Sequence, residues 1–372
     1  MRQHIAIFIP SLRGGGAERV ATALANGFAK NGHEVDLVLA KAEGPYLQDV
    51  AENVRIVDLD VNRVLRSLGP LVRYLRRERP QALLSFLNHA NMIAVLARKL
   101  AGIPVRLAVS ERNAPSATLV GGGKVAVMRT LSRLLLPKAD IVIGVSKAMG
   151  DELNAILKIP REKIDYVYNP VDLDGIRSRM TAPIDLGKTI DSSQPLIVAV
   201  GRLTRQKDYP TLLKAFSILL ERRSANLAIL GQGEDEAALK ILAQELGIGH
   251  RVLFPGFQAN PHAWIHASDL YVMSSRWEGL PNALLEALAC APRLVSTDCR
   301  TGPREILEDG KWGRLVPVGD AQALATAMDA ALDEPKRRDL VERAAAYHPE
   351  RTLEGYARLM NIEIERPLGT DS

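Results

Sequence analysis

Cysteine is scarce in this chain: Cys290 and Cys299 are the two in 372 residues. A secreted scaffold held by disulfides would need more, so the composition favours a reduced, cytoplasmic setting. No apolar run approaches the ~18 residues that a membrane-spanning helix requires. Residues 1–10 fit a short buried strand and not a signal peptide, because no small-residue cleavage site follows them. We therefore expect a cytoplasmic protein.

The chain also lacks low-complexity tracts and any repeat of fixed period. Its composition, 47% hydrophobic and 24% charged, is that of a globular protein. A length of 372 residues exceeds one ordinary domain and predicts two.

Acidic residues are sparse in the first half. Residues 1–170 hold 24 Lys or Arg against 15 Asp or Glu, whereas residues 171–372 hold 24 against 28. Two stretches, 61–79 and 124–138, combine clustered Arg and Lys with Leu and Val at helical spacing. Basic amphipathic helices can bind anionic membrane surfaces, although a solvated helix face would look the same. No aromatic platform accompanies the charge, so nucleic acid is not an expected partner.

Short β-branched runs alternate with helical segments in both halves, which predicts an α/β fold with two parallel sheets. Asn169-Pro170 is the expected crossover, because Pro170 interrupts a strand ladder. We expect domains at 1–170 and 171–349, with a last helix within 350–372 that packs back on the first. The expected strands are 4–9, 35–39, 82–86, 105–110, 141–146, 196–200, 227–230, 252–254, 270–273 and 293–297.

The segment S-S-R-W-E-G-L-P-N-A-L-L-E, residues 274–286, places two carboxylates eight residues apart. Pro281 suits a first helical turn, so Glu278 precedes a helix and Glu286 lies inside its apolar sequence. A buried carboxylate needs a hydrogen-bond donor, and a vicinal diol such as a ribose supplies two. The helix N-terminus favours an anion. A nucleotide sugar meets both needs, whereas a helix with one solvent-facing Glu is the plain alternative.

Arg202 and Lys207 follow the expected strand 196–200. Two cations on one strand-to-helix turn can bind a diphosphate, Arg with a fork and Lys as a point charge. Because Glu278 and Glu286 are also present, we prefer a diphosphate site to a solvated surface loop.

Glycine turns follow other strands. The turn at Gly14, Gly15 and Gly16 could bring backbone N–H groups close to a phosphate, but it lacks the spacing of a dinucleotide fingerprint. Gly231 and the pair Gly256-Phe257 could line a nucleotide base and ribose, or could serve as turns alone.

Glu111 lies where the strand 105–110 should end, so it could face an acceptor hydroxyl. A metal is not expected. His262 and His266 have the i, i+4 spacing of a metal pair, but no third ligand is in register. The two D-x-D patterns, at Asp58-Asp60 and Asp172-Asp174, are weak candidates because cations elsewhere can neutralise phosphates.

The ordered set of motifs resembles the family-4 retaining glycosyltransferases of the GT-B fold, in which two Rossmann-like domains face each other across a cleft. The resemblance covers nearly the whole chain, from Gly-Gly-Ala-Glu-Arg at 15–19 to Gly-Pro-Arg-Glu-Ile-Leu at 302–307. The sequence of residues 297–307 is most similar to that of enzymes that build bacterial surface polysaccharides and lipid-linked glycans.

This resemblance implies a role for each matching residue. Glu286 would hold the nucleotide ribose, Glu278 would orient the donor sugar, and Arg202 with Lys207 would neutralise the departing diphosphate. Many relatives have a His at the end of the strand 105–110, where this chain has Glu111, our candidate on the acceptor side. The remaining expected donor contacts are Gly15, Gly16, Gly231, Gly256, Phe257, Gly279, Leu280, Pro281 and Asn282.

The resulting hypothesis is a metal-independent, retaining transferase without a cofactor, which moves a hexose or N-acetylhexosamine from a UDP-sugar to a hydroxyl of a glycan. We expect a lipid-linked acceptor, with a soluble one as the alternative. An anionic membrane is a further expected partner. A UDP-sugar epimerase of the same fold, or a non-catalytic partner subunit, is the alternative.

Overall fold

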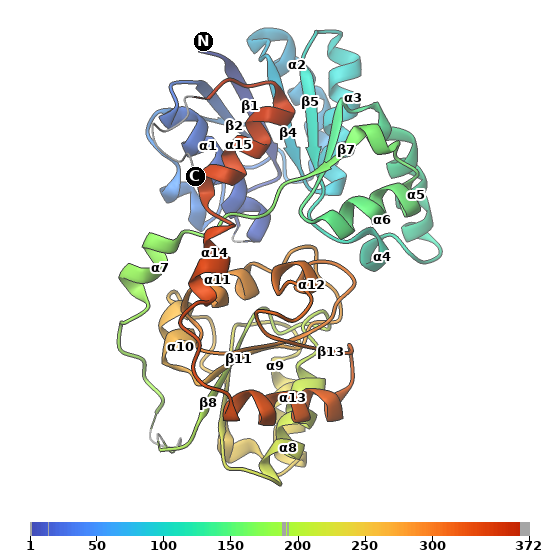
Figure 1. Ribbon diagram of the computed structural model, residues 1–372. Coiled ribbons are helices and arrows are strands. Elements are labelled where there is room, and N and C mark those ends of the chain that lie inside the picture. The colour runs from blue at the N-terminus through green and yellow to red at the C-terminus, as the bar shows by residue number, and fades with distance from the viewer. Residues whose placement is uncertain (1, 14, 188–190, 192, 365–372) are drawn as a thin grey trace. The chain divides into compact units, whose positions relative to one another are not determined.

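A computed structural model describes residues 2–13, 15–187, 191 and 193–364. It divides into two compact units: unit 1 comprises the described residues of Met1–Pro170 and Pro349–Ser372, and unit 2 comprises those of Val171–His348. The chain thus leaves unit 1 once and returns to it for its last helix (Figure 1).

Unit 1 is built on a seven-stranded parallel sheet of order β3-β2-β1-β4-β5-β6-β7. Helices lie on both faces, as a parallel sheet of apolar strands requires. Its strands are β1 His4–Ile9, β2 Glu34–Leu39, β3 Val54–Asp58, β4 Ala82–Phe86, β5 Arg106–Ser110, β6 Ile141–Gly144 and β7 Ile164–Tyr166. Its α-helices are α1 Gly16–Lys30, α2 Leu68–Glu78, α3 Asn88–Ala101, α4 Pro115–Thr118, α5 Lys124–Leu135, α6 Lys147–Leu157 and α15 Pro349–Met360.

Unit 2 contains a six-stranded parallel sheet of order β10-β9-β8-β11-β12-β13. Its core combines residues of the sheet with apolar faces of α8, α9 and α13. Its strands are β8 Leu196–Val200, β9 Asn226–Leu230, β10 Val252–Leu253, β11 Leu270–Met273, β12 Leu294–Thr297 and β13 Arg314–Val316. Its α-helices are α7 Leu173–Arg179, α8 Tyr209–Leu220, α9 Glu236–Glu245, α10 Pro261–Ala267, α11 Asn282–Cys290, α12 Pro303–Ile306, α13 Ala321–Asp333 and α14 Leu340–Ala345.

The last helix, α15, packs on unit 1 beside α1 (Figure 1). Its Tyr356 is fully buried, lies 6.2 Å from the ring of Phe86, and its hydroxyl is 3.0 Å from Ser110 Oγ. The C-terminal helix therefore reaches the carboxyl ends of β4 and β5. Residues 365–372 of the segment expected to pack here lie outside the described residues.

The ten expected strands are present within one or two residues of their expected ends. Three further strands, β3, β7 and β13, did not appear in the sequence interpretation. Each lies at the edge of its sheet and is partly exposed, so none has an uninterrupted apolar run.

Candidate active site

Three strand-end loops of unit 2 are joined backbone to backbone. Gly201 N–H donates to the Leu230 carbonyl at 2.9 Å, and Gly231 N–H donates to the Gly256 carbonyl at 2.9 Å. Leu203 N–H then donates to the Gln232 carbonyl, also at 2.9 Å. The loops after β8, β9 and β10 therefore form one rigid edge at the carboxyl ends of their strands, where ligands bind in such sheets.

The glycines of this edge are required by its close packing. Gly231 has φ +138°, and a Cβ there would collide with the carbonyl oxygen of Gly201. A Cβ on Gly233 would collide with the carbonyl of Leu203. Gly256 also has a positive φ, of +74°. The turn interpretation of these glycines therefore has a structural basis, while their contact with a nucleotide stays a prediction. Phe257, beside them, is 72% exposed.

Lys207 and Glu278 form an ion pair at the centre of the predicted donor site. Lys207 Nζ lies 2.6 Å from Glu278 Oε1, and Ser275 Oγ donates to the same oxygen at 2.7 Å. Gln206 Nε2 donates to Glu278 Oε2 at 3.2 Å. The side chains of Lys207 and Glu278 are 16% and 9% exposed, so three donors hold a nearly buried carboxylate in one orientation.

A second ion pair connects the same two loops. Arg276 Nη2 donates to Asp208 Oδ1 at 2.9 Å, and Ser274 Oγ donates to the carbonyl of Lys207 at 2.7 Å. Asp208 is buried and has φ +50°, a left-handed conformation that is uncommon outside glycine. Strained backbone of this kind gathers at functional sites, where the surrounding contacts enforce it.

The loop after β12 supports Glu278 from behind, a contribution absent from the sequence interpretation. Thr301 Oγ1 donates to the carbonyl of Glu278. A Cβ on Gly302 would collide with Pro281, so the two loops touch. Cys299 Sγ donates to the carbonyl of Ser275, and burial raises its pKa to about 12, which keeps the thiol protonated. Residues of the motif at 297–307 thus hold the loop after β11, which carries Glu278.

Glu286 lies on α11, as expected, and is 8% exposed. Pro281 is the residue that precedes this helix and not a residue of its first turn, a difference of one position. The buried carboxylate already has a protein partner: His262 Nε2 on α10 lies 2.9 Å from Glu286 Oε2. His262 was considered as half of a metal pair, but it is buried while His266 is exposed.

Arg202 lies on the same turn as Lys207 but extends into solvent. The part of the chain that the structure describes gives its side chain no ion pair. The structure therefore brings Lys207 and Glu278 together, places Glu286 on the following helix, and leaves the Arg202 fork exposed on the loop after β8.

In unit 1, Glu111 directly follows β5 and is 3% exposed. Asn91 Nδ2 donates to its Oε1 at 2.8 Å, and Asn88 Nδ2 donates to the same oxygen at 3.2 Å. Burial raises the pKa of Glu111 to about 7, and these two hydrogen bonds oppose the rise. Leu87, just before Asn88, has φ +74°, which is strained for a bulky residue. A carboxyl that titrates near neutral pH beside strained backbone is typical of a functional site.

The neighbours of Glu111 are bound to the C-terminal helix. Arg112 Nη2 donates to Asn169 Oδ1 at 2.6 Å, and its guanidinium lies 5.7 Å from the ring centroid of Phe86. Arg112 Nη1 also lies 3.4 Å from the Tyr356 hydroxyl. The cluster at the end of β5 is therefore partly structural, and Glu111 is its candidate for contact with substrate.

The glycine turn of unit 1 precedes α1. Gly15 is the residue before the helix and Gly16 its first residue, while Gly14 lies outside the described residues. The Glu18 carboxylate lies against Gly15, so a side chain at Gly15 would have to displace it. Contact of this turn with a phosphate stays a prediction.

Neither D-x-D pattern assembles a metal site. Asp60 pairs with Lys41 at 2.5 Å, and Asp172 accepts a hydrogen bond from Gly175 N at the start of α7. Over the described residues, no group of three His, Cys, Asp or Glu side chains lies close enough to hold a cation.

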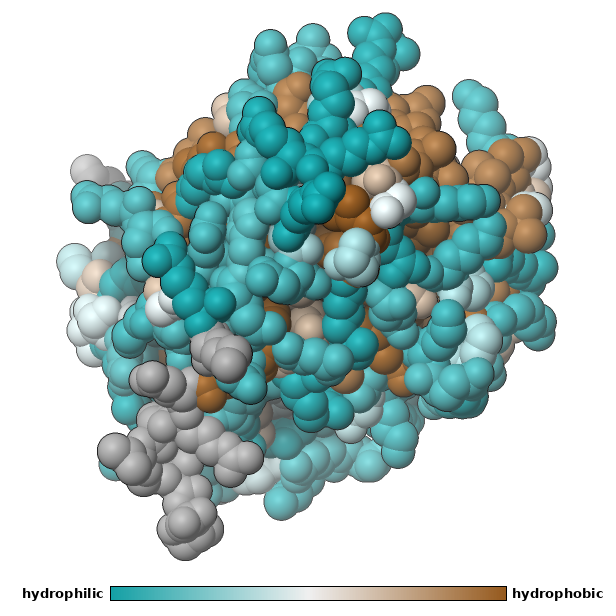
Figure 2. All heavy atoms as spheres, turned by 90° about the horizontal axis from the view of Figure 1, so that it is seen from above, coloured by the Kyte–Doolittle hydropathy of each residue, from teal (hydrophilic) through white to brown (hydrophobic). Residues whose placement is uncertain are grey.

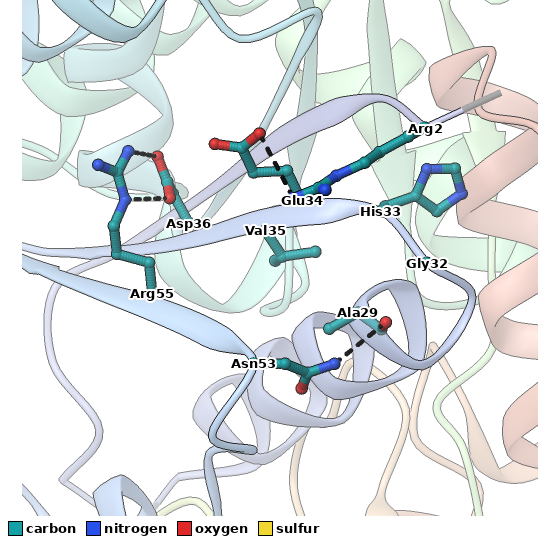
Figure 3. A pocket seen from close by; sticks show the side chains of 9 residues that line it. All are labelled: Arg2, Ala29, Gly32, His33, Glu34, Val35, Asp36, Asn53 and Arg55. Atoms are coloured by element: carbon teal, nitrogen blue, oxygen red, sulfur yellow. Dashed lines mark hydrogen bonds and ion pairs between the residues drawn. The ribbon is translucent and has the colours of Figure 1, made fainter.

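A pocket of about 340 Å³ lies at the opposite, amino-terminal edge of the unit 1 sheet (Figure 3). Arg55 directs its fork at the buried Asp36, with Nε at 2.7 Å from Oδ1 (Figure 3). His4 and Tyr74 also bind Asp36, and their hydrogen bonds with that of Arg55 hold the pKa of Asp36 low although burial opposes this. Because these charges satisfy one another, we regard this cluster as structural.

Comparison with known proteins gives two family models that together match most of the chain. The model described as Glycosyltransferase Family 4 matches residues 14–174, and the model described as Glycosyl transferases group 1 matches residues 185–347.

Relatives of similar length include the N-acetylgalactosamine-N,N'-diacetylbacillosaminyl-diphospho-undecaprenol 4-alpha-N-acetylgalactosaminyltransferase of Campylobacter jejuni. It is 29% identical, over 92% of this chain and 94% of its own. The lipopolysaccharide core biosynthesis glycosyltransferase LpsE of Rhizobium meliloti is 28% identical, over 88% of this chain and 89% of its own.

Among solved structures, HepE of Anabaena in complex with UDP and glucose superposes with a TM-score of 0.79. The match covers 97% of this chain and 100% of HepE at 19% identity, so it bears on the fold. A glycosyltransferase of Rickettsia africae matches with the same TM-score, over 97% of this chain and 98% of its own, at 16% identity. With the two parallel-sheet units, these likenesses confirm the GT-B fold expected from the sequence.

The Lys207–Glu278 pair should show strong coupling in stability. Either Lys207→Met or Glu278→Gln leaves a nearly buried group without its charged partner, whereas the double variant removes both charges. We expect a coupling free energy of about 2 kcal/mol in a double-mutant cycle, measured by urea denaturation without ligand. The exposed pair of Lys240 and Glu236 is the control, with an expected coupling below about 0.5 kcal/mol. Equal couplings would contradict this assignment.

Glu111 should make stability depend on pH. Its ordinary pKa is 4.5 and its folded pKa is about 7, so between these values the unfolded chain ionises while the folded chain keeps the proton. Wild type should therefore lose stability relative to Glu111→Gln as pH rises from about 4.5 to 7, by about 3 kcal/mol in total. Urea denaturation at a series of pH values measures this difference. A difference that does not change with pH refutes the buried-acid assignment, and Glu52→Gln, at an exposed glutamate, is the charge-matched control.

Proposed function

The chain belongs to the family-4 glycosyltransferases, and from this premise we propose that it moves a hexose or N-acetylhexosamine from a UDP-sugar to a hydroxyl of a lipid-linked glycan in cell-surface polysaccharide synthesis. The Lys207–Glu278 pair carries the donor part of the proposal, because it places a fixed cation and a fixed carboxylate side by side at the carboxyl edge of the unit 2 sheet. The name of the Campylobacter jejuni relative, which specifies a diphospho-undecaprenol acceptor, supports the acceptor part.

In the proposed donor complex, the diphosphate lies against Arg202 and Lys207, and the donor sugar contacts Glu278. In this complex the Lys207 ammonium is shared between Glu278 and the phosphates, while Ser275 and Gln206 keep the Glu278 carboxylate in place for the sugar hydroxyls. The exposed Arg202 adds a fork that suits two phosphate oxygens. The Gly279–Asn282 segment leads into α11, whose N-terminal backbone favours an anion. Glu286 then accepts hydrogen bonds from the ribose diol, and Phe257 offers a face for the base.

Chemistry at this site is electrostatic. As the bond between the sugar and the β-phosphate breaks, negative charge grows on the phosphate, and Arg202 and Lys207 stabilise it. We propose attack from the face that the diphosphate leaves, with a phosphate oxygen taking the acceptor proton, so that the anomeric configuration is retained. No metal ion or cofactor enters this scheme. On the acceptor side, the Glu111 carboxylate accepts a hydrogen bond from the attacking hydroxyl.

Two alternative functions make different demands on the chain. An epimerase of the same fold would convert the UDP-sugar alone into its epimer, and NMR of donor incubated without acceptor separates this outcome from transfer or slow hydrolysis. A non-catalytic subunit would not need the residues proposed to bind the nucleotide sugar, yet all four are present: Arg202, Lys207, Glu278 and Glu286. Membership of the glycosyltransferase family favours transfer.

Removal of the Glu286 carboxylate tests the donor assignment. Glu286→Ala should weaken UDP binding at least about tenfold, because charged hydrogen bonds to the ribose are lost. Isothermal titration calorimetry measures this affinity, and Glu245→Ala on the exposed surface of α9 makes the same change in charge as a control. Unchanged UDP affinity in Glu286→Ala would remove the basis of the proposal.

The proposal of a lipid-linked acceptor includes binding of the protein to an anionic membrane surface. Across the described residues, the helices are all too short or too polar to cross a bilayer. In the first basic stretch, α2 turns Leu71 and Leu75 into the core, and the exposed Leu65 lies before the helix, so its large apolar side chains form no exposed stripe like that of α5. The second stretch forms α5, where Val127, Leu131 and Leu134 are 61%, 42% and 60% exposed.

The exposed residues of α5 lie on one stripe. Val127, Leu131 and Leu134 recur at helical spacing, and exposed lysines, Lys124 and Lys138, stand at its two ends. Figure 2, which views unit 1 from above, shows hydrophobic surface at its right-hand edge, the side on which Figure 1 draws α5. An apolar stripe between cations fits the interface of an anionic membrane, where the aliphatic groups enter the acyl boundary.

Vesicle binding tests this surface. Wild type should sediment with vesicles that contain phosphatidylglycerol, and salt should weaken the binding. Leu131→Glu should reduce binding at least about tenfold, because it places a charge where an apolar group inserts. Ile241→Glu, at an aliphatic residue of α9 that is 59% exposed, is the matched control and should bind as wild type does. Equal binding to pure phosphatidylcholine vesicles, or equal loss in both variants, would overturn the assignment.

A further inference from the structure

The partner of Glu286 inside unit 2 is a histidine that the donor scheme does not use. His262 is the second residue of α10 and is 4% exposed, and α10 packs against α11, which carries Glu286. The 2.9 Å contact joins His262 Nε2 to Glu286 Oε2. An imidazole and a carboxylate that are both nearly buried, at hydrogen-bond distance, restrict each other's side-chain rotamers.

The surroundings of the imidazole assign its proton. His262 Nδ1 is buried and has no hydrogen-bond partner in the described part of the chain. A proton on Nδ1 would leave a buried donor unsatisfied and would set the Nε2 lone pair against a carboxylate oxygen. With the proton on Nε2, the ring donates to Glu286, and Nδ1 is a bare acceptor, the less costly group to bury. The hydrogen bond therefore runs from His262 to Glu286.

This hydrogen bond has a consequence for a bound nucleotide. A carboxylate has about four positions for hydrogen-bond donors, so the bond from His262 restricts its plane and by itself uses one of them. A carboxylate with a fixed plane binds two neighbouring hydroxyls at lower entropic cost than one that samples several rotamers. The same bond also offsets the cost of burying Glu286 before any ligand arrives.

We propose that His262 is a positioning residue for nucleotide recognition: through Nε2–H it orients the Glu286 carboxylate toward the vicinal diol of the donor ribose. This inference rests on the proposed function, which supplies the ribose. The same hydrogen bond could merely tie α10 to α11, and the two roles differ in one measurable respect. Positioning affects only ligands that carry the diol, whereas a purely structural tie affects all ligands alike.

The experiment compares UDP with 2',3'-dideoxy-UDP, which lacks both ribose hydroxyls. Calorimetry on wild type should give UDP the higher affinity. His262→Phe keeps a ring of similar volume without a donor, and should weaken UDP about tenfold while it leaves dideoxy-UDP unchanged. His262→Gln, whose amide can donate from a similar position, should restore most of the UDP affinity. His266→Phe, at the exposed histidine one turn along the same helix, is the matched control and should bind both nucleotides as wild type does.

The outcomes separate this inference from the function on which it rests. Equal weakening of both nucleotides in His262→Phe, or no weakening of either, overturns the positioning role alone. A wild type that binds no UDP, or binds UDP and dideoxy-UDP equally, overturns the ribose assignment of Glu286 as well. Should His262→Phe fail to fold, long-range ¹H–¹⁵N NMR on wild type still tests the hydrogen bond on which the inference depends. The Nε2–H tautomer supports the inference, and the Nδ1–H tautomer refutes it.

Discussion

An ion pair between Lys207 and Glu278 joins two loops of unit 2 at the predicted donor site. Lys207 comes from the loop after β8 and Glu278 from the loop after β11, and their contact at 2.6 Å joins the two at the carboxyl edge of the sheet. Ser275 and Gln206 also donate hydrogen bonds to the Glu278 carboxylate. Asp208 and Arg276 form a second ion pair between the same two loops. The charged groups of the proposed donor site are thus oriented before any ligand binds, which is the condition for electrostatic catalysis.

The two units bury carboxyl groups and contain strained backbone that the fold itself does not require. Glu278, Glu286 and Glu111 are buried carboxyls, and each depends on side-chain donors supplied by a neighbouring loop or helix. Asp208 and Leu87 adopt positive φ next to two of these groups. Buried carboxyls and strained backbone both lower stability, so their concentration at the carboxyl ends of the two sheets marks where function has been favoured.

The sequence was sufficient for the architecture and for the positions of the main charged residues. Buried strands such as β1 and β8 are continuous apolar runs, which periodicity detects, whereas the edge strands β3, β7 and β13 are partly polar and escape it. Glu286 was identified as a buried acid in need of a donor, but its partner was not. His262 lies 24 residues earlier, and only the packing of α10 on α11 brings the two together.

Tertiary packing was also needed to interpret the glycines and the basic stretches. From sequence, Gly231 could serve a ligand or a turn, and only the approach of the Gly201 carbonyl reveals the steric requirement. The stretches 61–79 and 124–138 are both basic and rich in leucine, yet α2 turns Leu71 and Leu75 into the core, whereas α5 exposes Leu131 and Leu134. Composition gives amphipathicity, and tertiary packing decides which face stays uncovered.

Helix α15 gives unit 1 an unusual order of assembly. Tyr356 meets Ser110 and Phe86 at the ends of β5 and β4, although the whole of unit 2 separates them in the chain. During translation, all of unit 2 must leave the ribosome before this corner of unit 1 can close. A polypeptide that stops short of residue 349 lacks α15 and leaves the end of β5, next to Glu111, without its contact to Tyr356.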